Sequence, residues 1–588
     1  MRTKSMSLLD AIKDQIRQVA LKHALVNRFK YGQAKPEPIV NKILGEFKEV
    51  RQYAKDVIAI VRDIVHYVNN LDNNEFRKLI DELNISLESE HKVETKTLPP
   101  LPNVDKWKNI KTRFAPNPDF PIHLGNARAA ILSYTYATMY KGTFILRFED
   151  TDPRTKKPML EAYEIIREDL RWLGVSWDEE YIQSLRMDIY YEYLKKLIER
   201  GYAYIDTCNP EIFKELRNKG VPCPHRDTDP STNMEKLDKI FAREYGEGEA
   251  VVRIKTDLTH PDPAVRDWVI FRIIDTSRYP HPITGDKYIL WPTYNFAAAI
   301  DDHLMNISHI LRGREHTLNT IKQMYIYNYF NWRYPEVVNL GRVGLEELIL
   351  SKTWIKTQLK LNPDKFMGFD DVRFGTIAAL RRRGVIAETI RQIILDLGIK
   401  GSDAKISWKN IAALNRRLLD PKTKRVFVVC DPVKVHINNL STPLLIKIPY
   451  HPSSNLGQRE YSIKSPIVYI SSKDAETFMK NGYLRLMEFA NIKFLRKEND
   501  TIIAEYIDGG IEEAKRLEAN IVQWVPADHR INVRIISVKG MNLGITRCLG
   551  ESSLLKFNLS DIVQMVRIGF GRIDTIKKKS ITIILTHE

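Results

Sequence analysis

The fold is decided by the stretch Thr112-Arg-Phe-Ala-Pro-Asn-Pro-Asp-Phe-Pro-Ile-His-Leu-Gly-Asn-Ala-Arg128 and by the segment Phe144-Ile-Leu-Arg-Phe-Glu-Asp-Thr-Asp-Pro-Arg154. Residues 110–115 are partly β-branched and stop at prolines, which cannot continue a hydrogen-bonded strand. Apolar residues recur at helix spacing over residues 126–140, and Gly142 follows them. Residues 143–148 form a dense apolar run that is typical of a buried strand. The pattern predicts a right-handed βαβ unit with parallel strands.

The turn between the first strand and the helix contains His123-Leu-Gly-Asn126. In a βαβ unit, ligands bind at the carboxyl ends of the strands, and the helix N-terminus attracts phosphate. Gly125 allows a nucleotide to approach the backbone closely, and His123 can donate a hydrogen bond to a phosphate oxygen. A plainer interpretation is a helix entry capped by Asn126, with His123 as a surface residue. The turn taken alone favours the plainer interpretation.

The bulk composition restricts the class of protein. A chain of 588 residues exceeds one hydrophobic core and predicts about three to five domains. The net charge of +16 favours a polyanionic partner, although a basic composition alone does not decide this. Four cysteines in so long a chain argue against a disulfide framework and predict a reducing, cytoplasmic location. We find no signal peptide and no apolar run long enough to span a bilayer, so we expect no membrane association.

Three motifs follow one another along the chain: Arg113-Phe-Ala-Pro-Asn-Pro118, His123-Leu-Gly-Asn-Ala-Arg128 and Arg147-Phe-Glu-Asp-Thr-Asp-Pro153. Together they resemble the nucleotide signature of class I aminoacyl-tRNA synthetases, and more closely that of archaeal-type glutamyl-tRNA synthetases. One departure is Asn126, which stands where the family signature has its last His. A polar side chain at this position can still cap the helix or contact the nucleotide.

A second family signature, Lys-Met-Ser-Lys-Ser, is resembled by Ile349-Leu-Ser-Lys-Thr353. Lys352 keeps the position that supplies positive charge to the ATP phosphates. Ile349 replaces the first Lys, and Lys356 could supply the missing charge. The run from Trp291 to His316 also resembles the family, and its composition predicts a helix ending in an acidic pair, then a strand.

The resemblance implies an α/β multidomain fold with a Rossmann-type nucleotide-binding catalytic core. Residues 88–103 are predicted to form a polar tract and then a stiff, extended linker.

Short alternating runs in the last part of the chain predict β-barrels. In these barrels Trp524 could stack on bases, although most such aromatic residues fill barrel cores. The predicted domains are an N-terminal helical extension (1–95), the first Rossmann half (96–200), an inserted acceptor-binding domain (201–290), the second Rossmann half (291–345), the Lys-Met-Ser-Lys-Ser-like loop with a helical stem-contact domain (346–420) and the anticodon-binding β-barrels (421–588).

The resemblance also implies the substrates and the residues that bind them. ATP arrives with Mg²⁺, the carboxylate of L-glutamate attacks the α-phosphate, and the terminal ribose hydroxyl of the tRNA then takes the glutamyl group. Arg113 and Arg312 are expected to hold the side-chain carboxylate in guanidinium forks, and Glu149 to face the substrate ammonium group. The full predicted sets are Arg113, Ala115, Glu149, Tyr294 and Arg312 for glutamate, and His123, Gly125, Asn126 and Lys352 for ATP, with His123, Asn126 and Lys352 as the catalytic residues.

A zinc site is one interpretation of Asp206-Thr-Cys208 and Cys223-Pro-His225. The related synthetases often carry Cys-x-Cys and Cys-x-His in their inserted domain, and Asp206 stands here in place of the first Cys. Zinc accepts two thiolates, one imidazole and one carboxylate. The alternative is a degenerate site in which Cys208 and Cys223 are ordinary buried thiols.

The function favoured by these residues is that of a glutamate-tRNA ligase acting on tRNA(Glu), with tRNA(Gln) as a further candidate. Glutaminyl enzymes carry a non-basic residue at the position of Arg312, because a neutral amide leaves a second buried cation unpaired. The alternatives are a glutaminyl-tRNA synthetase and a non-catalytic, synthetase-like RNA-binding protein. The N-terminal extension offers a place for a protein partner.

Overall fold

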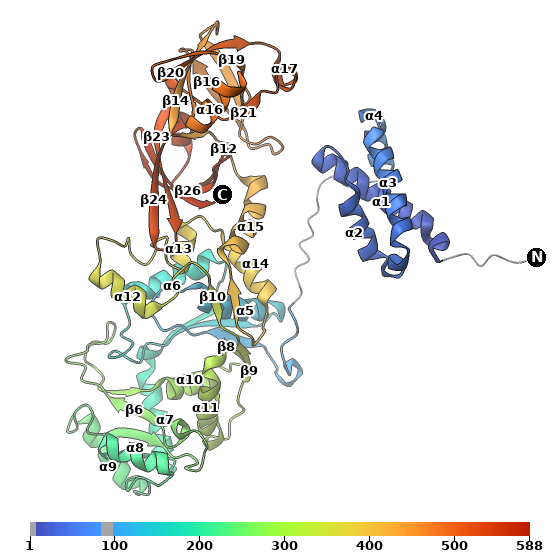
Figure 1. Ribbon diagram of the computed structural model, residues 1–588. Coiled ribbons are helices and arrows are strands. Elements are labelled where there is room, and N and C mark those ends of the chain that lie inside the picture. Colours follow the sequence, from blue (N-terminus) through green and yellow to red (C-terminus); the bar gives the residue numbers. More distant parts are fainter. Residues whose placement is uncertain (1–7, 84–97) are drawn as a thin grey trace, which may run out of the picture. The chain divides into compact units, whose positions relative to one another are not determined.

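The computed structural model describes residues 8–83 and 98–588, and the chain divides into two compact units at residue 95 (Figure 1). The first unit is helical, as the apolar spacing predicts. In the third of its helices the buried residues Val57, Val61, Val65 and Val68 recur every three or four positions and form one face of the core. The helices are α1 (Leu8–Tyr31), α2 (Pro36–Glu46), α3 (Ala54–Asn70) and α4 (Asn73–Glu82).

The second unit begins with a segment that is fastened to its core. Residues 98–103 were predicted to belong to an extended linker, and this prediction is wrong for them. The carbonyl of Pro99 accepts a hydrogen bond from the Tyr136 hydroxyl at 2.7 Å, and the Leu101 N–H donates to the Tyr140 hydroxyl at 3.1 Å. Leu101 is buried, so apolar packing outweighs the extended preference of the prolines. Residues 88–96 of the predicted linker lie outside the described residues.

The predicted strand–helix–strand unit is present. Strand β1 (Lys111–Phe114) pairs in parallel with β2 (Thr143–Phe148), which pairs in parallel with β3 (Glu179–Ile182). Helix α5 (Leu124–Met139) connects the first two strands, and α6 (Leu160–Trp172) connects the second pair. The parallel pair β8 (His309–Gly313) and β9 (Glu336–Leu340) continues this arrangement, because the Ser308 N–H donates to the Lys111 carbonyl at 2.9 Å. The carboxyl ends of β1, β2 and β8 therefore meet at one edge.

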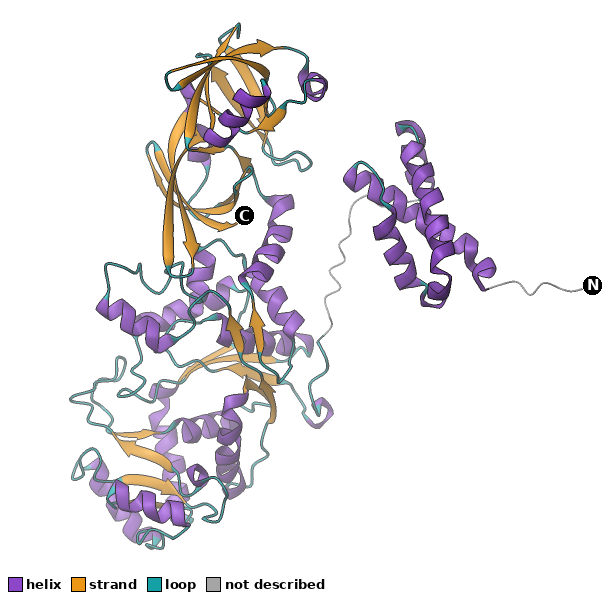
Figure 2. Ribbon diagram, viewed as in Figure 1, coloured by secondary structure: helices purple, strands orange, loops and turns teal. Residues whose placement is uncertain are grey.

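An antiparallel sheet separates the two parallel groups along the chain. It contains β4 (Ala203–Asp206), β5 (Val251–Ile254), β6 (Val269–Ile273) and β7 (Leu290–Pro292), with α8 (Pro210–Lys219) and α9 (Pro230–Phe241) (Figure 2). The flanking helices α7 (Met187–Glu199), α10 (Tyr294–Leu304) and α11 (Thr317–Tyr329) share one apolar core with this sheet.

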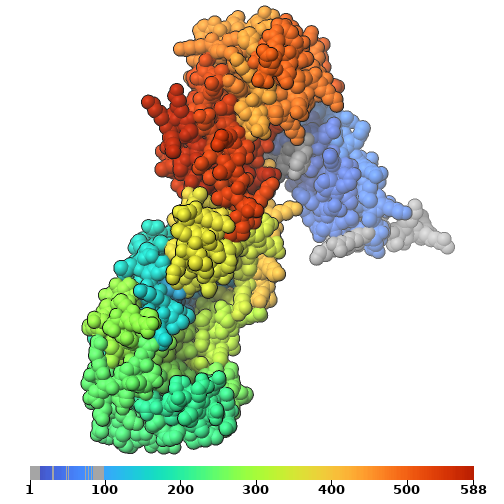
Figure 3. All heavy atoms as spheres, turned by 60° about the vertical axis from the view of Figure 1, so that its left-hand side comes forward, coloured from blue at the N-terminus to red at the C-terminus, as the bar shows by residue number. Residues whose placement is uncertain are grey.

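Residues after β9 form a mostly helical region. The strands β10 (Val343–Leu345) and β11 (Ala404–Ile406) pair in parallel, and the helices are α12 (Lys352–Leu361), α13 (Ile377–Arg382), α14 (Ala387–Leu397) and α15 (Trp408–Leu419). Figure 3 shows the surface around α12 in yellow, between the cyan first Rossmann half and the red C-terminal sheets. The packing of Met541 against Ile355 and Phe374 agrees with this view.

The C-terminal region consists of two half-barrel sheets of seven strands each, as the alternating runs predict. The first contains β12 (Arg425–Val426), β25 (Ile562–Met565), β26 (Gly569–Lys577), β27 (Ser580–His587), β23 (Arg530–Lys539), β24 (Asn542–Glu551) and β13 (Val428–Cys430). The second contains β21 (Asn520–Val522), β18 (Tyr483–Leu486), β19 (Asn491–Glu498), β20 (Thr501–Ile507), β14 (Pro432–Asn438), β17 (Ile467–Ser471) and β22 (Val525–Pro526). The hairpin β15 (Leu444–Pro449) and β16 (Gln458–Ile463) and the helices α16 (Ser472–Asn481) and α17 (Gly510–Arg516) complete the region.

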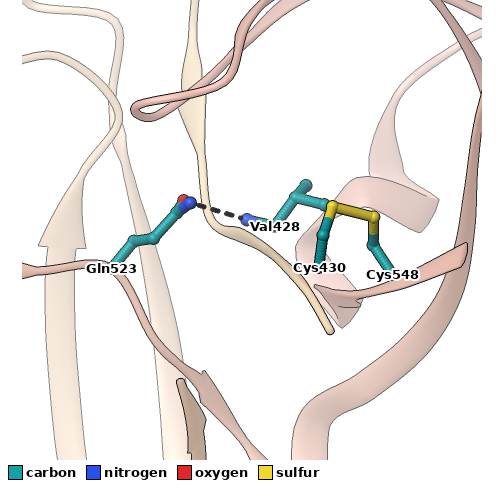
Figure 4. Close-up of a disulfide and its surroundings, with 4 residues drawn as sticks. All are labelled: Val428, Cys430, Gln523 and Cys548. Carbon is teal, nitrogen blue, oxygen red and sulfur yellow. Dashed lines mark hydrogen bonds between the residues drawn. A yellow bond between two sulfur atoms is a disulfide. The ribbon is translucent and has the colours of Figure 1, made fainter. Parts of the chain in front are cut away.

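Two side-chain predictions for this region are wrong. Cys430 and Cys548 form a disulfide, although the low cysteine count argued against one (Figure 4). The two residues are direct partners in the β13–β24 register, and sequence separation of 118 residues hides that pairing. Trp524 cannot stack on a base, because it is fully buried and its indole N–H donates to the Met487 carbonyl at 3.0 Å. Core packing accounts for this aromatic residue.

No helix in the described parts of the chain combines the length and the apolar character needed to cross a bilayer. The division into six domains stays a prediction.

Candidate active site

One cavity of about 800 Å³ lies at the edge where β1, β2 and β8 end. Residues from distant parts of the chain line it, including both halves of the Rossmann part and the segment before α12. It brings together every residue that the sequence assigned to glutamate or ATP: Arg113, Ala115, His123, Gly125, Asn126, Glu149, Tyr294, Arg312 and Lys352.

The helix N-terminus at this cavity is capped by His123. Its Nδ1 accepts hydrogen bonds from the N–H groups of Gly125 at 3.0 Å and Asn126 at 3.3 Å, while Asn126 Oδ1 accepts from the His123 N–H at 2.8 Å. His123 is thus the N-cap, and the plainer interpretation with Asn126 at that position is wrong. Asn126 closes a reciprocal capping box three residues later.

The cap fixes the chemistry of the imidazole. Because Nδ1 accepts two backbone hydrogen bonds, the proton of the neutral ring is on Nε2, which is left as a donor. Burial, and then the nearby charge of Lys352, lower the pKa of His123 to about 4. The ring is therefore neutral at pH 7. A Cβ on Gly125 would lie 2.9 Å from His123 Cε1, so only glycine leaves room for the ring.

A buried ion cluster adjoins the cavity through Arg113 and Glu149, which line it. Asp302 on α10 contacts Arg113 Nε at 3.2 Å and Arg147 Nη1 at 2.7 Å, and Arg147 Nη2 contacts Glu149 at 3.0 Å. Burial alone raises the pKa of Asp302, but the two guanidinium groups outweigh it and the pKa is lowered. Burial raises the pKa of Glu149 against the opposing effect of Arg147.

The neighbouring Asp301 extends this cluster away from the cavity. Its carboxylate accepts from Arg186 Nε at 2.9 Å and from the Tyr190 hydroxyl at 2.7 Å. Counting Arg312, four guanidinium groups accompany three carboxylates in and beside this cluster. One positive charge is left over.

Arg312 is the guanidinium without an anionic partner. It is 5% exposed, and its partners are the neutral groups Thr320 Oγ1 at 2.6 Å, Gln323 Oε1 at 3.1 Å and Tyr334 Oη at 3.2 Å. Within residues 8–83 and 98–588, no carboxylate lies within ion-pair distance, and its Nε has no hydrogen-bond partner. A buried cation held only by neutral dipoles is a site for an anion.

Several lining residues were not assigned from the sequence. Asp119 and Lys156 stand beside Lys352, and His316 and Asn319 stand beside Tyr294. Asp302 was recognised only as part of a matching segment, without a role. A motif identifies a position, whereas the partners of a side chain come from other segments of the fold.

The predicted metal ligands also converge. Atoms of Asp206, Cys208, Cys223 and His225 lie within 4.8 Å of one another, and the two sulfur atoms are 3.3 Å apart without a bond between them. Arg253 holds the other oxygen of Asp206 at 2.6 Å, and Thr207 Oγ1 contacts His225 Nε2 at 3.1 Å. These outer contacts aim one carboxylate oxygen and Nδ1 at the cluster, as in metal sites with supported ligands.

Comparisons with known proteins find two matching family models. Residues 109–421 match the family model "tRNA synthetases class I (E and Q), catalytic domain", and residues 423–508 match "tRNA synthetases class I (E and Q), anti-codon binding domain".

Relatives of similar length carry the name "Glutamate--tRNA ligase". The protein of Hyperthermus butylicus is 47% identical over 573 residues, covering 95% of this chain and 99% of the relative. The protein of Staphylothermus marinus is 48% identical over 575 residues, covering 96% of this chain and 100% of the relative. The protein of Pyrococcus furiosus is 45% identical over 583 residues, covering 98% and 100%.

The substitution Asp302→Asn tests the ion cluster. It leaves Arg113 and Arg147 undercompensated in a buried place, so we expect unfolding to become easier by about 3–5 kcal/mol. Because Asp302 has a lowered pKa in the folded state, its contribution is present above about pH 4 and is lost as the pH falls below it. Calorimetric melting of parent and variant at pH 7 and at about pH 3 tests this, because the difference in melting temperature should be smaller at the lower pH.

The control is Glu192→Gln, which removes an exposed ion pair with Lys196. Its melting temperature should stay close to that of the parent. Equal effects of the two substitutions would contradict the stabilising role of the cluster.

Proposed function

The chain belongs to the class I tRNA synthetases for glutamate and glutamine, it is a glutamate-tRNA ligase, and we propose which of its residues perform that reaction. Near full-length identity of 45–48% to proteins of that name supports the activity. The glutaminyl and non-catalytic alternatives are not favoured.

The observation that carries the glutamate pocket is Arg312, a buried guanidinium without a carboxylate partner in the described chain. Arg113 lines the same cavity but is partly neutralised by Asp302. We assign the substrate side-chain carboxylate to these two residues. Glu149 then faces the ammonium group, while Ala115 and Tyr294 line the pocket walls.

The charge balance supports glutamate over glutamine. The buried cluster has one surplus positive charge, and zwitterionic glutamate carries one net negative charge. Glutamine carries none, so its binding would leave a buried cation uncompensated, at a cost of several kcal/mol. The pocket therefore discriminates by charge rather than by size.

The substitution Arg312→Gln tests this pocket. Removing the cation should lower kcat/KM for glutamate by roughly 10²–10³-fold, because a buried charge pair is broken (about 3–5 kcal/mol). Aminoacylation of tRNA(Glu) with labelled glutamate measures it, and labelled glutamine is tried in parallel.

Arg314→Gln is the matched control. Arg314 lies two residues away, is half exposed and pairs with Asp403, outside the cavity lining. It should keep the parental rate. If Arg312→Gln also kept it, the assigned pocket would be wrong.

ATP is assigned to the turn at the start of α5. The neutral His123 offers its Nε2–H to a phosphate oxygen, Gly125 and Asn126 form the turn, and Lys352 supplies positive charge across the cavity. Mg²⁺ arrives bound to ATP. Glutamate attacks the α-phosphate, pyrophosphate leaves, and the tRNA ribose hydroxyl displaces AMP from the mixed anhydride. Positioning and neutralisation of phosphate charge account for the rate.

The two nitrogen atoms of His123 are proposed to have separate roles, and His123→Asn separates them. Asn places an acceptor near the position of Nδ1 and keeps the helix cap, but it lacks the distal donor. We expect a melting temperature near the parental value and a 10²–10³-fold loss in ATP–pyrophosphate exchange. His123→Ala should lose both the helix cap and the distal donor, and loss of the cap should lower the stability by about 1 kcal/mol. Retained exchange in His123→Asn would exclude Nε2 as a phosphate donor.

A structural zinc ion is the proposed occupant of the cluster formed by Asp206, Cys208, Cys223 and His225. Two sulfurs, one imidazole nitrogen and one carboxylate oxygen are a ligand set that zinc accepts, and it would hold the start of α8 to the following loop.

Elemental analysis by mass spectrometry tests the metal site. We expect about one zinc per purified chain, and none, with a lower melting temperature, in Cys223→Ser. The double substitution Cys430→Ser with Cys548→Ser removes the other two cysteines and should leave the zinc in place. A parent without zinc after purification in its presence would show a degenerate site.

The partners are proposed as tRNA(Glu), which the C-terminal half-barrels would contact, and tRNA(Gln) as a second substrate. Charging of separate tRNA pools decides between them. The helical unit of residues 1–95 is the proposed place for a protein partner, and the cytoplasm is the proposed location.

A further inference from the structure

The departure at Ile349 has a structural counterpart. Ile349 packs against an apolar cluster that includes Phe120, Ile355 and Phe374, and its carbonyl accepts the Gly375 N–H at 2.8 Å. Its side chain therefore packs against apolar neighbours. The family's first signature lysine has no equivalent at this position.

Two lysines on α12 converge on one carboxylate. Ser351 caps the helix, and Lys352 and Lys356 lie one turn apart on the same face. The Lys352 ammonium contacts Asp119 Oδ2, and Lys356 Nζ lies 3.6 Å from the same oxygen. Burial of Ile355 beside them fixes the rotation of the helix about its axis.

Asp119 itself is a buried group at the cavity wall. Its side chain is 4% exposed, and in the described parts of the chain its Oδ1 has no hydrogen-bond partner. Lys156 lines the same cavity. Burial lowers the pKa of Lys352, Asp119 opposes this, and the charges of Lys356 and Lys156 add to the lowering. Two ammonium groups therefore share one carboxylate, and the charge of Lys156 on the same cavity adds to the surplus positive charge offered to a polyanion.

We propose that Lys356 is a second phosphate-binding lysine in place of the one missing at position 349, and that Asp119 is the positioning residue that holds the lysine pair. This rests on the proposed function of the cavity. The two ammonium groups share one anchor, so they reach the triphosphate from a fixed wall and contact its outer phosphates together. Asp119 also competes with the triphosphate for them, and this weakens ATP binding in the ground state while it fixes the geometry.

Lys356→Met tests the first part, with Lys356→Arg and Lys360→Met as companions. Lys360 is exposed and one turn further along α12. We expect ATP–pyrophosphate exchange of the full chain, with tRNA present, to fall 10- to 100-fold in kcat/KM for ATP, with KM for glutamate unchanged. Lys356→Arg should recover part of the loss, and Lys360→Met should match the parent.

Asp119→Asn tests the second part. A positioning role predicts a kcat lowered about tenfold with KM for ATP unchanged or lower, because the competing carboxylate is gone. Parental rates for Lys356→Met, or a loss shared equally by Lys360→Met, would overturn the assignment of Lys356. A raised KM for ATP together with a lower melting temperature in Asp119→Asn would overturn the positioning role. A parent without glutamate-dependent exchange would instead refute the function of the cavity.

Discussion

The pairing of Asp302 with Arg113 and Arg147 is the interaction on which the site depends. The two arginines are on β1 and β2, and the carboxylate lies on α10, 189 and 155 residues further along the chain. Each ion would be costly if buried alone, so the three stabilise one another only when both Rossmann halves are docked. The inserted sheet can therefore interrupt the core without disturbing it.

This arrangement determines the charge of the residues that line the cavity. Because Asp302 is shared between two guanidinium groups, the cluster cannot also neutralise Arg312, which neutral oxygens of Thr320, Gln323 and Tyr334 hold in place. Neutral dipoles hold this preorganised cation, and in the proposed function the bound substrate supplies the missing negative charge. The same logic applies at the opposite wall, where one carboxylate, Asp119, serves two lysines. Each wall is short of negative charge, and the two substrates are anions.

Local patterns in the sequence predicted the βαβ unit well, since β1, α5 and β2 need only neighbouring residues. The nine substrate residues came from motif resemblance, and the fold places all of them at one cavity. What failed depends on side-chain orientation or on distant partners. Helix capping by His123 needed the orientation of its ring, and the burial of Trp524 needed the curvature of a sheet. The disulfide needed the β13–β24 register. Asp119 was overlooked because its partners, Lys352 and Lys356, lie more than two hundred residues away.

The two departures from the family signatures are Asn126 and Ile349. Their contacts show whether these changes are signs that the catalytic site has been lost. Asn126 completes a hydrogen-bonded cap with His123, so the turn keeps its shape without the second histidine. Ile349 joins an apolar cluster, and Lys356 places an ammonium group 3.6 Å from Asp119, which lines the cavity. A decaying site would lose buried charges first, because an unpaired ion costs stability as soon as its ligand is no longer selected. Arg312 is such an ion, and its presence agrees with the proposed binding of an acidic substrate.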